Sequence, residues 1–340
     1  MRSLKKVGSV RVDLLGGTLD IYPINVVLDE VVTINCATSI FAEVEVLNRD
    51  DSQIILRSKD YNQEMTFSVE KLKKFNFTED ELGPLKFLLL LLKEISPSVG
   101  LEINLKSMAP TGSGLGGSSS MGSLFFKTVS DFLGLKMKRE HIVEIVQRVE
   151  SKVLNQGPAG YQDYYPSLFG GVLALEAKMS GVSIEQLFTS SFKKFLEENV
   201  SLIYSGESRD SGINNWEVYK RFFDRDKVIR EGLTKIRDLS RAALNSLRES
   251  NFEEFLCLLS EEGKTREGLF SGIMSQKMKS FQEELSRELD DFKGTKVCGA
   301  GGGGCFLVIS KNKSVVYKKA EKFGMSFLPF EVQGPVGEDN

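Results

Sequence analysis

The chain has 340 residues, and at roughly 100–200 residues per domain this length predicts two domains, or one large domain with insertions. Its hydrophobic share of 41% and charged share of 27% are typical of a globular protein with a sizeable core. The 44 Lys and Arg residues are balanced by 47 Asp and Glu residues, which leaves a formal net charge of −3. Because nucleic-acid-binding proteins carry an excess of positive charge, we expect no nucleic-acid partner.

The sequence also argues against a membrane protein, a secreted protein and a zinc enzyme. The longest apolar run, 87–92, is far shorter than the ~20 residues that span a bilayer. No apolar stretch follows the basic N-terminus, and the four scattered cysteines form no CxxC pair, so we expect reduced core thiols in a cytoplasmic protein. The single histidine, His141, is expected on a surface helix, which disfavours zinc and Ser-His-Asp chemistry.

Strand and helix patterns are mixed along the first half of the chain. β-Branched and aromatic residues in polar alternation predict strands, and apolar residues spaced by three and four predict helices. The expected strands cover residues 10–14, 31–35, 41–47, 101–105 and 172–175, and the expected helices cover about 118–132 and 140–154.

The second half is richer in helix. A charged stretch, 177–199, is expected to separate the halves, and two long amphipathic runs, 218–247 and 252–289, predict helices. The chain then closes with an expected strand at 305–309, a helix near 315–323 and a last strand around 327–332. This mixture predicts an α+β fold in two domains, residues 1–180 and 181–340.

The segment richest in glycine and hydroxyl groups, 110–120, lies between an expected strand and an expected helix. Bare backbone N–H groups and the positive end of a helix dipole favour a polyphosphate there, and hydroxyl groups suit Mg²⁺. The glycines satisfy GxGxxG but lie too far from the strand for a dinucleotide fold, and Ser118 stands where a Walker loop needs lysine. A flexible turn is the alternative. The candidate phosphate-binding residues are Pro110, Gly112, Ser113, Gly114, Leu115, Gly116, Gly117, Ser118, Ser119 and Ser120.

A second glycine run, 299–304, precedes the strand expected at 305–309. Five glycines in six positions cost conformational entropy unless the backbone must approach another group closely. Closure of a site between domains is one such reason, and a tight hairpin turn is the alternative.

Two shorter segments place an acid beside a glycine turn. The segment from Arg11 to Asp20 is typical of a strand that ends at paired glycines, and a carboxylate beyond them suits a polyhydroxy ligand. In 160–165, Asp163 follows a Gly-Pro-Ala-Gly breaker and precedes another glycine turn. Each segment alone also fits an ordinary turn.

Taken in order, these segments resemble the GHMP kinases, the superfamily of galactokinase, homoserine kinase, mevalonate kinase and phosphomevalonate kinase. The three motifs of that family correspond to 11–20, 110–120 and 297–304, which together span nearly the whole chain. Segments 11–20 and 160–164 most resemble the branch of D-glycero-D-manno-heptose 7-phosphate kinase and L-fucokinase, and 204–212 does so more loosely. The resemblance implies an N-terminal domain with the ATP phosphate loop, a ferredoxin-like C-terminal domain, and a nucleotide and sugar site in the cleft between them.

The resemblance also implies roles for single residues. Segment 110–120 would wrap the ATP phosphates, and Ser118 and Glu150 would bind Mg²⁺. Asp163 would be the catalytic aspartate, with Arg11 as its cationic partner toward the transferring phosphoryl group. The substrate-binding residues would be Asp20, Gly17, Thr18, Gly301, Gly302 and Gly303.

Two departures from the family pattern concern the phosphate loop and the acceptor. Gly117 stands where many relatives carry serine, which leaves one hydroxyl donor fewer toward phosphate. Tyr164, Tyr165 and Pro166 replace the pattern common in the heptose and fucose branch, which leaves the exact sugar open.

The implied activity is ATP- and Mg²⁺-dependent phosphorylation of a sugar or sugar-phosphate hydroxyl, anomeric as in the heptose and fucose enzymes. The alternatives are a kinase for a non-sugar alcohol such as mevalonate or homoserine, a catalytically silent sugar sensor, and a nucleotide-binding protein with convergent glycine loops. We expect no membrane partner, and a homodimer stays open. Arg209 is a candidate for a substrate phosphate, with a plain surface arginine as the alternative.

Overall fold

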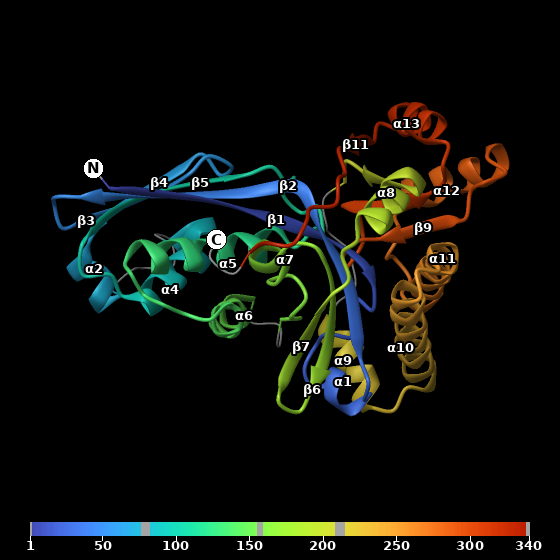
Figure 1. Ribbon diagram of the computed structural model, residues 1–340, viewed down its shortest axis with the longest axis horizontal. Coiled ribbons are helices and arrows are strands. Elements are labelled where there is room, and N and C mark those ends of the chain that lie inside the picture. Colours follow the sequence, from blue (N-terminus) through green and yellow to red (C-terminus); the bar gives the residue numbers. More distant parts are fainter. Residues whose placement is uncertain (1, 76–81, 155–158, 208–214, 338–340) are drawn as a thin grey trace.

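A computed structural model describes residues 2–75, 82–154, 159–207 and 215–337. These residues form two β-sheets with helices packed on them, and the mixed α and β fold expected from the sequence is confirmed (Figure 1). Among the described residues, no helix combines the length and the apolar character that crossing a membrane requires. Arg209 lies outside the described residues.

The larger sheet has seven strands and occupies the first half of the chain. Its strand order is β4–β3–β5–β2–β6–β7, and β1 pairs with β2. All neighbouring strands are antiparallel except β3 and β5, which are parallel. The strands are β1 (Ser3–Leu15), β2 (Val32–Arg49), β3 (Gln53–Ser58), β4 (Gln63–Ser68), β5 (Gly100–Ser107), β6 (Val172–Lys178) and β7 (Gly181–Gln186).

The long strand β2 organises this sheet. The two strands expected at 31–35 and 41–47 are one continuous strand, because β1 pairs with it through most of its length. Its second half, from Ala42 to Arg49, pairs with β5, and its first part, from Val32 to Cys36, pairs with β6. The two partner strands therefore diverge beside the middle of β2. The loop that follows β5 begins at this opening, and the segment that precedes β6 ends there.

Helices cover one face of the larger sheet (Figure 1). The expected helices 118–132 and 140–154 are α5 (Gly117–Phe132) and α6 (Arg139–Leu154), and α4 (Lys86–Ile95) holds the apolar run. Fully buried side chains such as Leu89, Phe125 and Ile103 form one core between these helices and the sheet. The remaining helices of this half are short: α1 (Ile24–Val27), α2 (Val69–Lys74), the 3₁₀ turn η1 (Gly83–Leu85) and α7 (Pro166–Phe169).

The second sheet is antiparallel, with strand order β11–β8–β10–β9. Its strands are β8 (Val200–Tyr204), β9 (Gly294–Val297), β10 (Cys305–Ile309) and β11 (Ser326–Leu328). The helices of this half are α8 (Ser190–Asn199), α9 (Asn215–Phe223), α10 (Lys227–Arg248), α11 (Phe252–Leu269), α12 (Gln276–Glu288) and α13 (Lys313–Lys322). Each long amphipathic run is thus two helices rather than one.

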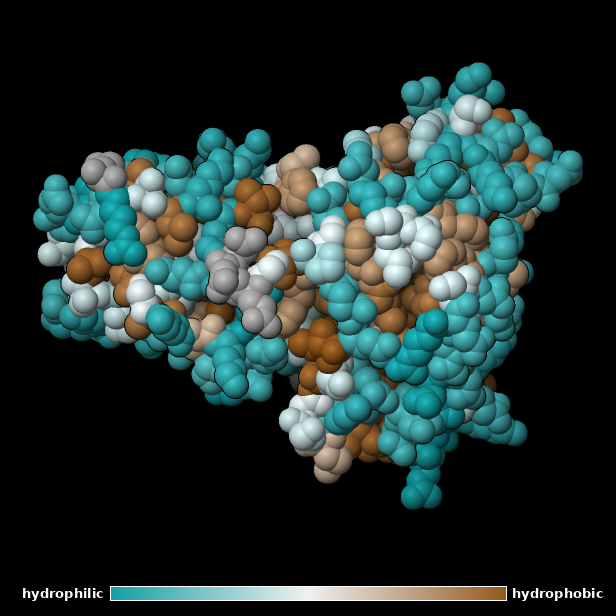
Figure 2. Space-filling view, in the orientation of Figure 1, coloured by the Kyte–Doolittle hydropathy of each residue, from teal (hydrophilic) through white to brown (hydrophobic). Residues whose placement is uncertain are grey.

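The stretch 177–199 is not the spacer expected from its charge. It contains β7, which pairs with β6 in the larger sheet, and α8, whose N-cap Thr189 accepts a hydrogen bond from the Phe192 amide. Its charged residues are all partly or fully exposed, where charge does not oppose regular structure, and Figure 2 shows hydrophilic residues over much of the right-hand end of the molecule. The domain division near residue 180 stays a prediction, and that position falls in the turn between β6 and β7.

The last described residues return to the first half of the chain. Val332 forms an isolated bridge with Thr38, and Pro335 forms one with Gly170. Arg139 on α6 donates to the carbonyl oxygen of Val336 at 3.2 Å. In Figure 1 the last described residues accordingly run past α7 toward α5.

Candidate active site

The loop between β5 and α5 has the geometry of an anion-binding turn. Gly112, Gly114 and Gly116 have φ values of +72°, +76° and +69°, a left-handed backbone conformation that glycine adopts at low cost. Gly116 is the N-cap of α5 and provides no capping side chain. The first-turn amides of this sixteen-residue helix are therefore free for an anion, which the helix dipole also attracts.

A cavity of about 480 Å³ opens at this loop and brings the distant motifs together. Its lining includes Arg11, Gly17, Thr18, Asp20, Pro110, Gly112, Ser113, Gly114, Gly116, Gly117, Ser118, Ser119, Glu150, Asp163, Gly299 and Ala300. Apolar side chains from other elements, among them Tyr61, Phe87 and Met121, line the same cavity.

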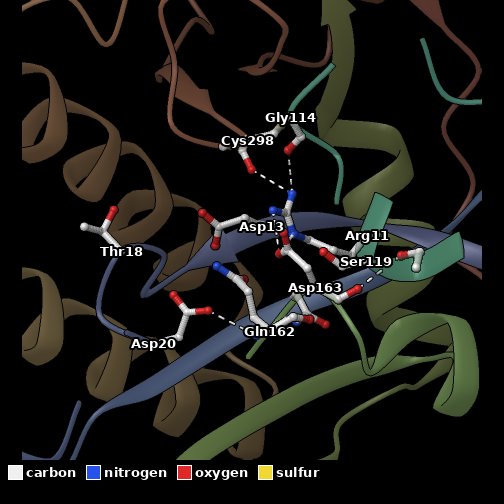
Figure 3. A network of polar contacts seen from close by, with 12 residues as sticks. Arg11, Asp13, Thr18, Asp20, Gly114, Ser119, Gln162, Asp163 and Cys298 are labelled. Carbon is white, nitrogen blue, oxygen red and sulfur yellow. Dashed lines mark hydrogen bonds and ion pairs between the residues drawn. The ribbon is translucent and has the colours of Figure 1, made fainter. Parts of the chain in front are cut away.

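An ion pair between Arg11 and Asp163 lies beside the loop (Figure 3). Arg11 Nε and Nη2 each lie 2.7 Å from Asp163 Oδ1, and Nη1 donates to the carbonyl oxygens of Gly114 at 2.6 Å and Cys298 at 2.8 Å. Burial opposes the charge on Arg11, but the carboxylates of Asp163 and Asp13 outweigh burial and raise its pKa. The Asp163 side chain is 28% exposed, so its carboxylate is held by arginine and still faces the cavity.

Glu150 lies on the other side of the α5 N-terminus, among hydroxyl groups. It is 6% exposed, and Ser119 Oγ donates to its Oε2 at 2.7 Å. Burial raises the pKa of Glu150, while hydrogen bonding from Ser119, Tyr164 and Ser118 lowers it in part. Ser118, the expected metal ligand, is exposed in the cavity wall, and its neighbour Ser119 makes the short contact with the carboxylate.

Asp20 faces the cavity from the turn that follows β1. It is 4% exposed, and its Oδ2 accepts a hydrogen bond from the Gln162 amide at 3.0 Å. Burial and the nearby charge of Asp163 raise its pKa to about 7. In Figure 3, Asp20 and Thr18 lie on one side of Gln162, and the Arg11–Asp163 pair lies on the other.

A buried charge cluster below the cavity was missed by sequence reasoning. Lys296 on β9 is fully buried, and its Nζ lies 2.8 Å from Asp13 Oδ2 and 3.6 Å from Glu262 Oε1. Arg266 on α11 lies 3.3 Å from the same Asp13 oxygen. These two cations outweigh burial and lower the pKa of Asp13, whereas burial raises the pKa of Glu262 to about 7. A signal was available: Glu262 and Arg266 continue the apolar stripe of Phe255 and Leu259 along α11.

Several expected site residues do not line the described cavity. Leu115 is fully buried in the core, and Ser120 Oγ donates to the Asp163 carbonyl oxygen instead. Gly301, Gly302 and Gly303 do not line this cavity, whereas Gly299 and Ala300 do, so their expected contact with a substrate stays a prediction. The Gly302 amide donates to the Ile273 carbonyl oxygen at 2.9 Å, because this part of the run packs against the segment after α11.

Three of the four cysteines expected in the core are buried. Cys36, Cys298 and Cys305 are buried and free, and burial raises their pKa, which keeps the thiols protonated and unreactive. Cys257, by contrast, is exposed on α11, since it lies on the outer side of the helix. His141 is exposed on α6, as expected.

Comparison with known proteins finds a family match for part of the chain and relatives that cover most of it. Residues 84–171, which contain the loop, α5, α6 and Asp163, match the family described as GHMP kinases N terminal domain. The chain is 25% identical to a mevalonate kinase of Methanocaldococcus jannaschii over 288 residues, which cover 81% of this chain and 84% of that protein. It is 23% identical to a D-glycero-alpha-D-manno-heptose 7-phosphate kinase of Campylobacter jejuni over 331 residues, 94% of this chain and 93% of that protein.

Solved structures with a similar fold include a sugar kinase. Galactokinase of Lactococcus lactis, solved with galactose, matches with a TM-score of 0.77 and 17% identity over 98% of this chain and 95% of that one. At this identity the match speaks for the fold alone. Sugar kinases and mevalonate kinases are thus both among the relatives.

Proposed function

We propose, from the premise that residues 84–171 are a GHMP kinase N-terminal domain, that this protein transfers the γ-phosphoryl group of ATP to a hydroxyl group of a sugar or sugar phosphate. The observation that carries the proposal is the Arg11–Asp163 ion pair, which faces the cavity between the anion-binding loop and the Asp20 turn. Residues 1–180 and 181–340 would be the two domains, and the anomeric hydroxyl, as in heptose or fucose kinases, would be the attacked group.

The described residues have the groups that phosphoryl transfer needs. Such reactions depend on positioning and charge neutralisation more than on covalent chemistry by the protein. The first-turn amides of α5 would bind the phosphates, and Arg11 would neutralise charge on the transferring group. Asp163 would orient the acceptor hydroxyl and accept its proton. An anomeric hydroxyl has a lower pKa than other sugar hydroxyls, which makes the electrostatic part of this role larger.

The surroundings of Glu150 fit a magnesium ion. Among the described residues no ion pair neutralises this buried carboxylate, and hydroxyl oxygens of Ser118 and Ser119 lie beside it at the phosphate loop. The described residues contain no cluster of three or more His, Cys, Asp or Glu side chains suited to a metal. Mg²⁺ needs none, since it binds through one or two carboxylates and the substrate phosphates. When bound there, it would offset the negative charge of the phosphates.

The acceptor end of the cavity favours a polyhydroxy group over a carboxylate. Asp20, Asp163 and the Gln162 side chain line it, and carboxylates and amides are good partners for sugar hydroxyls. A substrate carboxylate placed against these two acids would be repelled. The mevalonate kinase relative, which covers most of the chain, makes a non-sugar alcohol the second candidate. A silent sugar sensor is disfavoured because Arg11, Asp163 and Glu150 all face one cavity.

The first test is ADP release from Mg·ATP with a panel of free sugars, heptose 7-phosphate, mevalonate and homoserine. Turnover of one sugar would support the proposal, and NMR of the product would locate the phosphate. Turnover of mevalonate alone would replace the sugar assignment by the second candidate. Bound ATP without turnover would favour the sensor, and failure to bind ATP would contradict the anion-binding role of the loop.

The magnesium assignment has its own test. Glu150→Gln keeps the shape of the side chain and removes its charge, so we expect the Mg²⁺ concentration for half-maximal activity to rise about tenfold or more. Glu144→Gln is the control, because Glu144 lies exposed on the same helix. Equal magnesium dependence in both variants would remove Glu150 from the metal site.

A further inference from the structure

We propose that Arg266 is a positioning residue that holds the turn carrying Thr18 and Asp20 in the geometry that the acceptor needs. This inference rests on the proposed function in one respect: the turn of residues 16–20 is taken as the acceptor-binding turn. Arg266 comes from α11, far along the chain, and it also lines the cavity.

The contacts of Arg266 join three segments. Its Nη2 donates to Thr18 Oγ1 at 3.3 Å and to the Gly299 carbonyl oxygen at 3.0 Å. Its Nη1 donates to Asp13 Oδ2 at 3.3 Å and to the Val297 carbonyl oxygen at 3.1 Å. One guanidinium therefore connects the end of β1, the turn after it and the start of the second glycine run.

The turn needs such support because its backbone is strained. Thr18 has φ +81°, a left-handed conformation that is unfavourable for a β-branched residue and persists only where surrounding contacts impose it. Thr18 is only partly buried and lies against the cavity, so packing alone does not enclose it. The hydrogen bond from Arg266 restrains its side chain directly.

A second contact from α11 holds the other end of the turn. Glu262 lies four residues before Arg266, one helical turn away, and its Oε2 accepts a hydrogen bond from the Gly16 amide at 2.9 Å. Arg266 is 2% exposed, and its Nη donors all point to protein acceptors. It therefore shapes the acceptor turn rather than binding the acceptor itself.

Hydrogen exchange tests the inference without any substrate. In Arg266→Met we expect amides of a peptide spanning residues 15–21 to exchange about tenfold faster than in the unaltered protein. The control is Arg248→Met on the neighbouring α10, which removes an exposed bidentate pair with Glu185. Unchanged exchange in a folded Arg266→Met protein would overturn the inference, whatever the activity of the enzyme.

Kinetics separate positioning from a purely structural role. With an acceptor that the unaltered enzyme phosphorylates, Arg266→Met should lower kcat/KM for that acceptor about 100-fold and leave the KM for ATP nearly unchanged. Thr18→Val removes the hydroxyl and keeps the ion pair with Asp13, so it should cost about tenfold on the acceptor even if Arg266→Met fails to fold. Thr18→Ser keeps a hydroxyl group for Arg266, so it should cost less on the acceptor than Thr18→Val.

The double variant gives the decisive comparison. If Arg266 acts through Thr18, combining Arg266→Met with Thr18→Val should cost little more than Arg266→Met alone. Additive losses, or equal losses of affinity for ATP and acceptor, would instead show that Arg266 only stabilises the fold. A protein that phosphorylates nothing in the substrate panel would contradict the proposed function, while the exchange result would still decide the role of Arg266.

Discussion

Two glycine-rich loops meet at the site, and they use glycine for different reasons. The loop 110–117 leads into a long helix, and its left-handed glycines turn the backbone so that amides at the helix N-terminus face the cavity. The run 299–304 joins β9 to β10 as a hairpin, and most of it packs against protein. The first loop exposes backbone to the cavity, whereas only Gly299 and Ala300 of the second run line it.

The contacts between the loops explain the second set of glycines. A Cβ atom at Gly304 would lie 2.8 Å from the Ser113 carbonyl oxygen, and one at Gly299 would lie 2.9 Å from that of Gly114. The Cys305 amide donates to Ser113 O at 2.7 Å, and Arg11 joins the loops through Gly114 and Cys298. The hairpin thus supports the loop 110–117. A glycine run in a sequence therefore does not by itself indicate a ligand.

The largest expected effect concerns Asp163, which lies beside Gly116 of the first loop. Asp163→Asn removes the proton acceptor and one half of the ion pair, so we expect kcat to fall by about 10²–10⁴-fold while ATP binding changes little. Steady-state kinetics and ATP titration of the same preparation measure both. Retained turnover would remove Asp163 from the mechanism, and loss of ATP binding would mean that Asp163 acts by shaping the phosphate loop.

A substitution in the run 299–304 tests whether its glycines are needed for packing against the loop 110–117. Gly304→Ala forces a left-handed alanine, φ +76°, against Ser113 O, and we expect a loss of about 2–4 kcal/mol in the free energy of unfolding. Gly134→Ala is the matched control: its φ is +77°, and its Cβ would meet nothing within 4 Å. It should lose about 1 kcal/mol. Denaturant unfolding compares the two, and equal losses would contradict close packing at Gly304.

The smallest expected effect is a pH dependence of stability. The pKa of Asp20 is about 7 in the folded protein, above its usual value of 3.8, so the folded state binds more protons between these values. The free energy of unfolding therefore falls as the pH rises through this window. Asp20→Asn removes this contribution, and we expect its Tm to exceed that of the unaltered protein by a few degrees at pH 8 but not at pH 4. Equal differences at both pH values would show that folding does not raise the pKa of Asp20.

The local sequence pattern correctly predicted those helices and strands whose own residues show a clear periodicity or composition. Helices α5 and α6 and strands β5 and β10 follow from periodicity and composition within about two residues. Strands β3, β4, β7, β8 and β9 were missed. β3 is short, β4 and β7 have few or no buried residues, and β8 and β9 are nearly uniform in burial, without the alternation that marks a half-exposed strand. The continuity of β2 depends on its pairing with β1, which no short window contains.

The candidate site likewise contains residues that the sequence predicts and contacts that only the tertiary structure reveals. Arg11, Asp163, Glu150 and the loop 110–120 could be named from the sequence because the order of its motifs resembles that of the GHMP kinases. Tertiary structure alone decided that Ser119 contacts Glu150, that Gly299 rather than Gly301 lines the cavity, and that Lys296 and Arg266 hold Asp13. Asp13 and Lys296 are 283 positions apart. Contacts at such separation depend on how the two sheets and α11 pack, whereas sequence pattern reports only on neighbours along the chain.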